Sequence, residues 1–474
     1  MTTIPENIGQ FYLGTQILPD AGTPVLYDAA DLTTHAVIIG MTGSGKTGLG
    51  ITLLEEAALD GIPVIAIDPK GDLGNLALNF PARRTADFAP YADAASLAQS
   101  GQTADAWAAA TAQKWGEGID ASQQSAARQE ALAAANPVHI YTPGGEHGLP
   151  LSLLAHLGAP DPAIKDDREA YADYLDSTAA ALLALVKEAG DSTSPAQLYL
   201  THILKHHWDA GRDLDLAQLI SQIQNPPIAQ IGVLPINQVF PAKARDKLAL
   251  AFNNLLAAPG FSAWLQGAPL DSQQLLYDAQ NRAQTSIINI AHLNDAERMT
   301  LVTLLLGNLI AWMRRQSGSS TLRAILYMDE LYGYLPPSAN PPSKKPLLTL
   351  LKQARAYGLG LVLSTQNPVD LDYKALANAG TWLIGRMQTA QDRARVADGL
   401  TSASAQGLDR ATLETWFDHI DKRRFLLHNI HEASPCILQS RHAMSYLAGP
   451  LSREHIRALT ANDPRRATAS VAAE

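Results

Sequence analysis

The chain has 474 residues, a formal net charge of -10 and a single cysteine, Cys436. This length accommodates one large domain or two to three ordinary ones. The acidic balance excludes a broadly basic surface, so any contact with nucleic acid must come from a local cluster of lysines and arginines. The single cysteine excludes an intramolecular disulfide and a multi-cysteine metal site, and it indicates a reducing compartment.

The first 34 residues lack a helical or strand period, and their prolines and glycines predict an extended lead-in with one or two short strands. No basic stretch precedes an apolar one there, so no signal peptide is expected. The longest apolar stretches, 178–186 and 301–313, are shorter than the roughly 18 to 20 residues that cross a membrane. We therefore expect a cytoplasmic protein.

The first part of the core, 35–150, begins with a strand, a helix and a second strand. The apolar runs 35–40 and 63–67 predict buried strands of a parallel sheet, and the leucines and alanines of 46–59 predict the helix between them. Three such elements in close succession form a βαβ unit. The pattern continues with an alanine-rich helical region and one more strand, at 91–136 and 138–142.

Helical segments such as 171–188 and 195–209, with little strand pattern, predict an all-helical insertion over 151–284. The second part of the core, 285–459, is expected to have strands at 286–290, 324–328, 360–364, 382–384, 424–429 and 435–439, with helices at 295–315 and 346–357. A frayed tail is expected from 460 to 474. The predicted fold class is therefore α/β, a parallel sheet flanked by helices and interrupted by the insertion.

The segment between the first strand and the first helix fits the pattern GxxxxGK[ST] in full, with Gly40, Met41, Thr42, Gly43, Ser44, Gly45, Lys46 and Thr47. Glycines let consecutive backbone N–H groups point at a phosphate, and the following helix adds its positive N-terminal dipole. We expect Lys46 to reach the β- and γ-phosphates of ATP and the Thr47 hydroxyl to ligate Mg²⁺. This segment is called the phosphate loop below.

Polar side chains follow two of the later strands. Asp329 and Glu330 come directly after the apolar run 324–328, and Gln366 follows the run 360–364. Ligands of parallel sheets bind at the carboxyl ends of the strands, so we expect these side chains beside the phosphate loop. There Asp329 would hold Mg²⁺, Glu330 would activate the attacking water, and Gln366 would bond the γ-phosphate or that water.

Eight segments together resemble the bacterial HerA-like ATPases of the HerA/FtsK superfamily: GMTGSGKTGL, VIAIDPKGDLGNL, IYTPGGEHGLPLSLL, SIINIAHLND, MDELYGYLPP, LKQARAYGLGLVLSTQNP, TWLIGRMQTAQDRARVADGL and SRHAMSYLAGPLSREHI. The resemblance covers about residues 11–457, and its most specific parts are 68–73 and 353–368. It implies a RecA-like core, hexameric rings and ATP-driven translocation of DNA through a central pore. Archaeal members carry an N-terminal β-barrel before the phosphate loop, but only 39 residues precede Gly40 here, so that barrel is not expected.

Ring motors complete each site with an arginine from the neighbouring subunit. Arg386, just past the strand 382–384, is the first candidate for this role and Arg355 the second. Lys344 and Lys345, in a proline-rich loop after Glu330, are the candidate DNA contacts. Two alternatives stay open, an ATP-regulated assembly subunit without motor activity and a soluble secretion or conjugation ATPase. The sequence also leaves open a partner nuclease or membrane complex.

Overall fold

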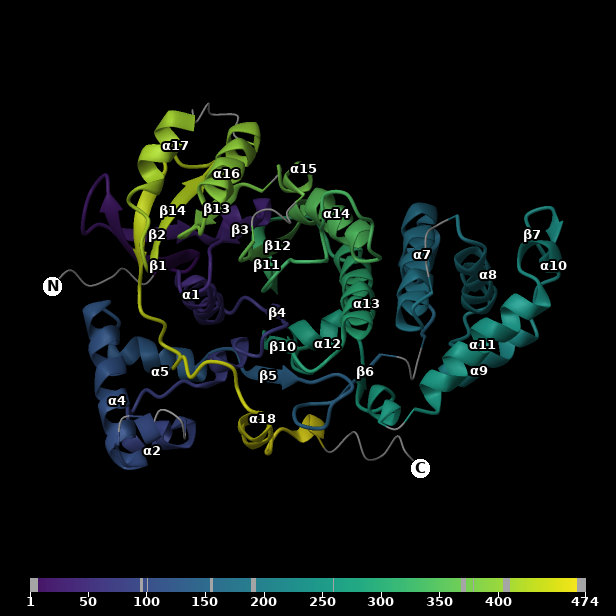
Figure 1. The fold of residues 1–474 in the computed structure, drawn as a ribbon, viewed down its shortest axis with the longest axis horizontal. Helices are drawn as coiled ribbons and strands as arrows, with labels where there is room; N and C mark the ends of the chain where they lie inside the picture. Colours follow the sequence, from purple (N-terminus) through teal and green to yellow (C-terminus); the bar gives the residue numbers. More distant parts are fainter. Residues whose placement is uncertain are drawn as a thin grey trace.

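A computed structural model of the chain describes residues 7–93, 97–99, 101–153, 157–188, 193–258, 260–367, 372–377, 379–403 and 410–466. The described residues form an 11-stranded sheet flanked by helices, and a further group of helices lies to one side of it (Figure 1). The strand order is β2-β1-β15-β14-β13-β3-β12-β11-β4-β10-β5. The α/β fold class predicted from the sequence is therefore confirmed.

Neighbouring strands in the middle of the sheet are parallel: β13 (Thr381–Ile384), β3 (Ala36–Ile39), β12 (Tyr357–Thr365), β11 (Ser319–Met328), β4 (Val64–Asp68), β10 (Thr285–Asn289) and β5 (Val138–Tyr141). All residues of β3, β4 and β10 are buried, as is typical of parallel strands covered on both faces. In this order β12 and β11 lie between β3 and β4. The carboxyl ends of these four strands therefore meet at one edge of the sheet.

Beyond β13 the sheet is antiparallel, with β14 (Arg424–Asn429), β15 (Cys436–Ser440), β1 (Gln10–Leu18) and β2 (Pro24–Asp28). The sheet is thus mixed rather than purely parallel. The N-terminal lead-in is more regular than expected, because β1 pairs with β15 from near the other end of the chain. Apolar runs show that a strand is buried, but they do not show which strand it pairs with or in which direction.

Helices cover both faces of the sheet, and alternate residues of β3 show this. Ile38 belongs to the same buried cluster as Leu53 of α1 (Lys46–Leu59), whereas Ile39 belongs to the cluster of Leu306 in α13 (Asp295–Arg314). Successive side chains of a strand point to opposite faces, so α1 and α13 lie on opposite sides. The predicted bounds of both helices agree with the structure to within one residue.

The insertion contains α6 (Pro162–Asp166), α7 (Arg168–Leu185), α8 (Pro195–Asp209), α9 (Leu216–Gln224), α10 (Ile236–Val239), α11 (Ala242–Leu256) and α12 (Ser272–Leu276). It is not entirely helical, because β6 (Leu151–Ser152) pairs with β9 (Ala268–Pro269) and β7 (Gln230–Ile231) with β8 (Leu234–Pro235). Figure 1 shows α7 beside α13, and Thr300 Oγ1 donates to the Ala181 carbonyl at 3.0 Å. Leu182 shares a buried cluster with Ile39, so the core of the insertion is continuous with that of the sheet.

The remaining helices are α2 (Thr85–Phe88), α4 (Ala104–Ala121), α5 (Ala126–Ala134), α14 (Lys344–Gln353), α15 (Tyr373–Leu376), α16 (Ala390–Ala403), α17 (Arg410–Phe417) and α18 (Arg453–Leu459). Among the described residues, every helix is too short or too polar to cross a membrane. The expectation of a frayed tail is wrong for 460–466, because Arg465 donates to Tyr141 Oη at 3.0 Å and to Gln284 Oε1 at 2.8 Å. The rest of that tail, 467–474, lies outside the described residues.

Candidate nucleotide-binding site

The phosphate loop connects β3 to α1 through a backbone that glycine alone adopts readily. Gly43 and Gly45 have φ angles of 80° and 97°, in the left-handed region. A Cβ at position 45 would also lie 2.8 Å from Cγ of Arg423, whose backbone N–H donates to the Ser44 carbonyl at 2.7 Å. The loop is therefore closed tightly against the start of β14, and a side chain at position 45 would force them apart.

The first turn of α1 presents backbone N–H groups to a cleft. Gly45 is the N-cap of this helix and provides no side-chain acceptor for them. Uncapped N–H groups and the helix dipole together favour an anion at this position. The cleft in front of them has a volume of about 560 Å³ and is lined by Met41, Thr42, Gly43, Gly45, Lys46, Thr47, Gly48, Lys70, Asp72, Gln366 and Pro450.

Lys46 joins the phosphate loop to the ends of two strands. Its side chain is only 3% exposed, and Nζ lies 3.0 Å from Asp329 Oδ1 and 2.7 Å from Ser364 Oγ. Burial alone would raise the pKa of Asp329, but the ammonium groups of Lys46 and Lys70 and the bonds to this carboxylate hold it below its usual value. Asp329 is therefore a buried carboxylate kept in its charged form by cations of the site.

Glu330 follows Asp329 at the end of β11 and lies at the margin of the cleft. Its Oε1 accepts from Thr365 Oγ1 at 2.9 Å, and its Oε2 accepts from Lys70 Nζ at 3.1 Å. Its φ angle is 71°, which is strained for a residue other than glycine. Backbone conformations of this kind are concentrated at active sites and switch regions, so this one marks Glu330 as a candidate functional residue.

The end of β12 contributes Gln366 next to the phosphate loop. Thr42 Oγ1 donates to Gln366 Oε1 at 2.9 Å, and the Gln366 side chain lines the cleft. Strand pairing alone does not require this contact, because β12 and β3 have already ended at these residues. The structure thus brings Lys46, Asp329, Glu330 and Gln366 to one edge of the sheet, as expected from their positions after parallel strands.

The loop after β4 adds two residues that sequence reasoning did not assign. Lys70 reaches Glu330, and Asp72 Oδ2 accepts from Thr47 Oγ1 at 3.3 Å. Asp68 shapes this loop by accepting from the backbone N–H groups of Lys70, Gly71 and Leu73. Burial, followed by the Asp72 carboxylate, raises the pKa of Asp68 to about 7. The available signal was DPKGD directly after a buried strand, the same arrangement that identified Asp329.

Arg386 lies beside its own phosphate loop. Its carbonyl accepts from the Met41 N–H at 2.9 Å, because β13 is the neighbour of β3, and its side chain is exposed. A role of Arg386 in a neighbouring subunit stays a prediction.

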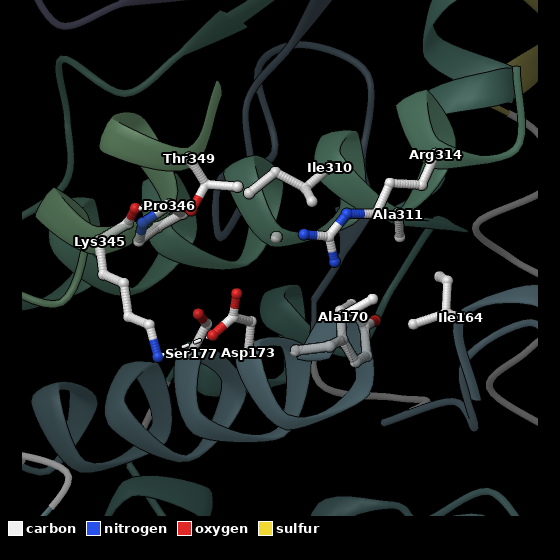
Figure 2. Close-up of a pocket in the computed structure, with 12 residues that line it drawn as sticks. Ile164, Ala170, Asp173, Ser177, Ile310, Ala311, Arg314, Lys345, Pro346 and Thr349 are labelled. Atoms are coloured by element: carbon white, nitrogen blue, oxygen red, sulfur yellow. Dashed lines mark hydrogen bonds and ion pairs between the residues drawn. The ribbon is translucent and has the colours of Figure 1, made fainter. Parts of the chain in front are cut away.

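The two candidate DNA contacts are engaged within the chain. Lys344 is 8% exposed, donates to the Pro336 carbonyl at 2.6 Å and lies 3.1 Å from Asp372 Oδ2. The expectation that Lys344 faces DNA is therefore wrong, because its ammonium group closes the loop before α14. Lys345 is half-exposed, and Figure 2 shows its side chain extending to Asp173 of α7, where the two groups are 2.8 Å apart. Lys345 thus connects α14 to the insertion.

Mg²⁺ normally binds through one or two protein side chains together with substrate phosphates. The described residues contain no group of three or more His, Cys, Asp or Glu side chains placed to hold a metal ion by themselves. Thr47 lines the cleft, and the buried Asp329 carboxylate contacts the cleft-lining Lys46; its Oδ2 has no hydrogen-bond partner among the described residues. These oxygen donors fit Mg²⁺ that arrives with a nucleotide.

Comparison with known proteins agrees with the motifs and the topology. A sequence profile described as the central domain of helicase HerA matches residues 11–149. The structure of VirB4 of Thermoanaerobacter pseudethanolicus aligns over 93% of this chain and 99% of its own, with a TM-score of 0.55 and 13% identity. The bacterial conjugative coupling protein TrwB aligns over 95% of this chain and 92% of its own, with a TM-score of 0.51 and 12% identity.

TrwB in complex with the GTP analogue GDPNP is also similar, with a TM-score of 0.50, 13% identity, and coverage of 95% of this chain and 98% of that one. No curated protein sequence matches the chain. At these identities the structural matches establish the fold alone, and the profile match shows a sequence similarity confined to the segment that contains the phosphate loop. Residues 11–149 are therefore similar to the central domain of helicase HerA, and the chain as a whole has a fold similar to those of VirB4 and TrwB.

Proposed function

We propose that the chain is an Mg²⁺-dependent ATPase whose hydrolysis drives translocation or remodelling of DNA by a ring of subunits. The observation that carries this proposal is the convergence of the phosphate loop with the acidic end of β11. Lys46 contacts Asp329 and Ser364, while Glu330 stands at the cleft margin on a strained backbone. A phosphate-binding cation and a nearby carboxylate that can accept a proton from water are the groups that hydrolysis of a phosphoryl bond uses.

The chain's own residues would act as follows. The N–H groups of the phosphate loop and the Lys46 ammonium group would bind and orient the β- and γ-phosphates. Glu330, held between Thr365 and Lys70, would accept a proton from the attacking water. Gln366, already bonded to Thr42, would position that water or the γ-phosphate. Thr47 and Asp329 would hold Mg²⁺, which neutralises charge on the phosphate oxygens when it is bound.

Translocation of DNA rests on the match of residues 11–149 to helicase HerA. The net charge of -10 repels a polyanion, so the DNA path requires a concentrated basic surface. With Lys344 buried, that surface must be sought elsewhere, and Lys422 to Arg424 are the next candidates. Of these, Arg423 is partly committed, because it bonds His442 Nε2 at 2.6 Å and the Ser440 carbonyl at 2.5 Å.

A secretion or conjugation ATPase is the second candidate. Its support is the extent of the structural alignment: VirB4 and TrwB align over more than nine-tenths of this chain, insertion included, whereas the HerA profile ends at residue 149. DNA-stimulated hydrolysis separates an ATPase that acts on DNA, whether a HerA-like motor or a DNA-pumping conjugation ATPase, from one that does not. A motor on DNA should hydrolyse ATP faster when duplex or single-stranded DNA is added. A protein-secretion ATPase, or an assembly subunit that only changes partner affinity, should not respond.

The chemistry is tested with two substitutions and a control. Lys46→Ala should weaken ATP binding, because the phosphates lose a buried cation. Glu330→Gln should bind ATP as the parent does and lower turnover by about 100-fold or more, the range for loss of a general base. Glu117→Gln, on the exposed face of α4, is the matched control and should change neither. Calorimetry measures binding and phosphate release measures turnover; an unchanged rate in Glu330→Gln would remove Glu330 from the mechanism.

A further inference from the structure

Asp72 has a contact that the proposed roles leave unexplained. Thr47 Oγ1, the side chain expected to ligate Mg²⁺, donates to Asp72 Oδ2 at 3.3 Å. The other oxygen, Asp72 Oδ1, is buried and has no hydrogen-bond partner among the described residues. Asp72 also lines the cleft in front of the phosphate loop. A carboxylate with one unbonded buried oxygen is costly unless something positive binds there in a working state.

Among the described residues, the Asp72 carboxylate accepts a hydrogen bond from Thr47 alone. Asp72 precedes the short helical turn Leu73–Ala77, yet its side chain does not cap that turn. Its position is set by its neighbours: Asp68 holds the N–H groups of Gly71 and Leu73, and Asn75 Nδ2 donates to the Asp72 carbonyl at 2.6 Å. The loop is thus fixed through its backbone, and the carboxylate is left to face Thr47.

The spacing of the two oxygens suits one metal ion. Mg²⁺ binds oxygen at 2.0–2.1 Å in near-octahedral geometry, so two adjacent ligands lie about 3 Å apart. The Thr47 and Asp72 oxygens are 3.3 Å apart and need little movement to meet this spacing. Asp329 is the independent second observation. Its side chain is fully buried, its Oδ1 is taken by Lys46 and Ser364, and its Oδ2 has no hydrogen bond among the described residues.

We propose that Asp72 is a ligand of the Mg²⁺ that accompanies the nucleotide, adjacent to Thr47, with Asp329 supporting the ion from the strand side. This assignment rests on the proposed ATPase function and deepens it. It makes the loop after β4 part of the metal site. The segments that follow β3, β4 and β11 would then each contribute one oxygen donor, from Thr47, Asp72 and Asp329 respectively. Because no described group of three acidic or imidazole side chains surrounds the position, phosphate oxygens must complete the coordination. Mg²⁺ should therefore bind together with the nucleotide and only weakly without it.

The test is the gain in ADP affinity that Mg²⁺ provides, measured by calorimetry with Mg²⁺ and with excess chelator. ADP keeps turnover out of the measurement. Asp72→Asn removes the charge but keeps an oxygen that can accept from Thr47. It should cut the Mg²⁺-dependent gain by about 10- to 100-fold, the usual range for residues that support a metal. Affinity for ADP without Mg²⁺ should be unchanged or higher, because a negative charge near the phosphates is gone.

Asp120→Asn is the control, since Asp120 is 64% exposed on α4, away from the cleft, and its loss changes the net charge equally. Asp72→Ser is the second variant, and circular dichroism and melting temperature confirm that each variant is folded. A parental Mg²⁺-dependent gain in both folded Asp72 variants would overturn the assignment and leave the ATPase proposal intact. A parent protein that binds no ADP under either condition would instead overturn the ATPase proposal, and this assignment with it.

Discussion

Lys70 contacts two carboxylates of the candidate site at once and lines the cleft. Its Nζ lies 3.1 Å from Glu330 Oε2 and 3.8 Å from Asp329 Oδ2, and its side chain is 30% exposed. Because Lys70 lines the cleft, a triphosphate bound there would bring further negative charge near the same ammonium group. Lys70 is thus placed to bind the end of the phosphate chain while it fixes the direction of Glu330.

Lys70→Ala should therefore weaken ATP binding by about 10-fold or more, as expected for a lost hydrogen bond from a charged group. AMP, whose single phosphate lies at the other end of the chain, should bind almost as it does to the parent. Lys70→Arg keeps the charge and should recover part of the ATP affinity. Calorimetric titration with a non-hydrolysable ATP analogue and with AMP measures both. Equal losses for the two nucleotides would show that Lys70 acts on the fold of the loop and not on the phosphates.

His442 supports the phosphate loop through Arg423. Burial, followed by the Arg423 guanidinium, lowers the pKa of His442 from 6.5 to about 4, and Nε2 accepts from Arg423 Nη1. The unfolded chain therefore binds a proton at His442 between pH 6.5 and about 4, where the folded chain does not. Folding stability from this group is complete above pH 6.5 and is lost as the pH falls towards 4.

We expect the parent protein to lose more stability than His442→Gln as the pH is lowered from 7 to 4.5, because glutamine offers an acceptor that does not titrate. Denaturant unfolding at several pH values measures the difference, and the control is His419→Gln at an exposed histidine. Parallel stability curves for the parent and His442→Gln would assign the acid sensitivity to other groups, such as the buried His35, whose pKa burial also lowers to about 4.

The site residues that could be predicted from the sequence are those whose role follows from local pattern. GxxxxGK[ST] defines a loop by itself, and Asp329 and Gln366 each follow a strand that apolar residues identify. Lys70 and Asp72 required one more fact, that β4 lies next to β11. The prediction that Lys344 contacts DNA was wrong because it depended on the residue type alone. The sequence of a proline-rich loop does not reveal that its carbonyl groups bind the lysine in the folded chain.

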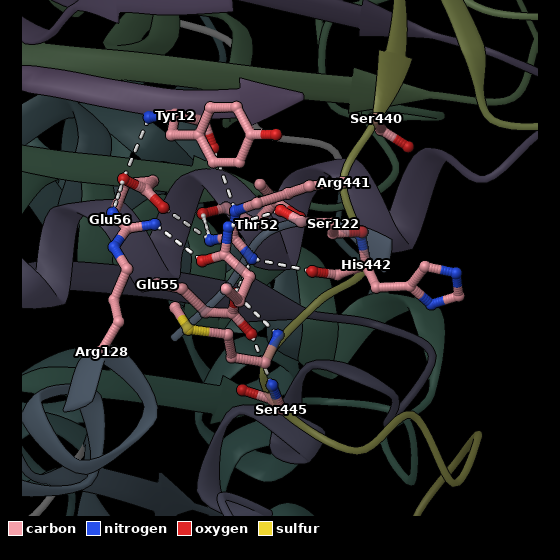
Figure 3. Close-up of polar contacts among 12 residues, drawn as sticks. Tyr12, Thr52, Glu55, Glu56, Ser122, Arg128, Ser440, Arg441, His442 and Ser445 are labelled. Atoms are coloured by element: carbon pink, nitrogen blue, oxygen red, sulfur yellow. Dashed lines mark hydrogen bonds and ion pairs between the residues drawn. The ribbon is translucent and has the colours of Figure 1, made fainter. Parts of the chain in front are cut away.

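Helix α1 is held against the rest of the fold by a buried network of charged side chains. Glu55 and Glu56 project from α1 and are met by Arg441, which follows β15, and by Arg128 of α5 (Figure 3). Arg441 is fully buried. Its Nη1 lies 2.7 Å from Glu55 Oε2, and its Nη2 lies 2.7 Å from Glu56 Oε1. Glu55 also accepts from the N–H groups of Met444 and Ser445. The helix that begins at the phosphate loop is thus held by the C-terminal part of the chain.

Arg441→Met should lower the free energy of unfolding by about 3 to 5 kcal/mol, because it leaves buried glutamates without their main counter-charge. Arg84→Ala is the control: Arg84 is 73% exposed, and loss of its pair with Asp87 should leave the free energy of unfolding nearly unchanged, because exposed ion pairs contribute little. Urea unfolding followed by circular dichroism gives both values. A cost near that of the control would mean that water or the other arginine compensates the glutamates in the variant.

The elements themselves were mostly predictable, whereas their partners were not. The bounds of α1, α8 and β14 agree with the periodicity of the sequence, since each is a continuous amphipathic or buried segment. Pairing β1 with β15, or Arg441 with Glu55, joins residues several hundred positions apart. No local period encodes such contacts, and they decide that the sheet is mixed and that the lead-in is part of it.

The insertion is connected to the candidate nucleotide-binding site through α14. The loop after Glu330 leads to α14, where Lys345 pairs with Asp173 and Asp176 of α7. On its other side α7 packs against α13, which covers the sheet. The α14 helix is therefore the direct connection between the segment after Glu330 and the insertion.

The proposed ring predicts that two inactive variants can restore activity when they are mixed. Arg386→Ala should bind ATP as the parent does and hydrolyse it up to about 10³-fold more slowly, the range for a lost arginine finger. Mixed with Lys46→Ala, which keeps Arg386 but has a defective phosphate loop, it should regain activity. With random equimolar mixing about a quarter of the head-to-tail interfaces would combine an intact loop with an intact arginine.

The alternative is that Arg386 acts in its own subunit. It is supported by the hydrogen bond that the Arg386 carbonyl accepts from the Met41 N–H of the same phosphate loop. If the arginine serves its own site, every subunit in the mixture carries one defect and no interface repairs it. Phosphate release at several mixing ratios, with rings verified by native mass, distinguishes the two. Recovery that peaks near equal amounts places Arg386 in the neighbouring site, since that ratio maximises mixed interfaces. A flat, inactive series with intact rings assigns it to the subunit that carries it, and the ring would then need another arginine, with Arg355 the next to test.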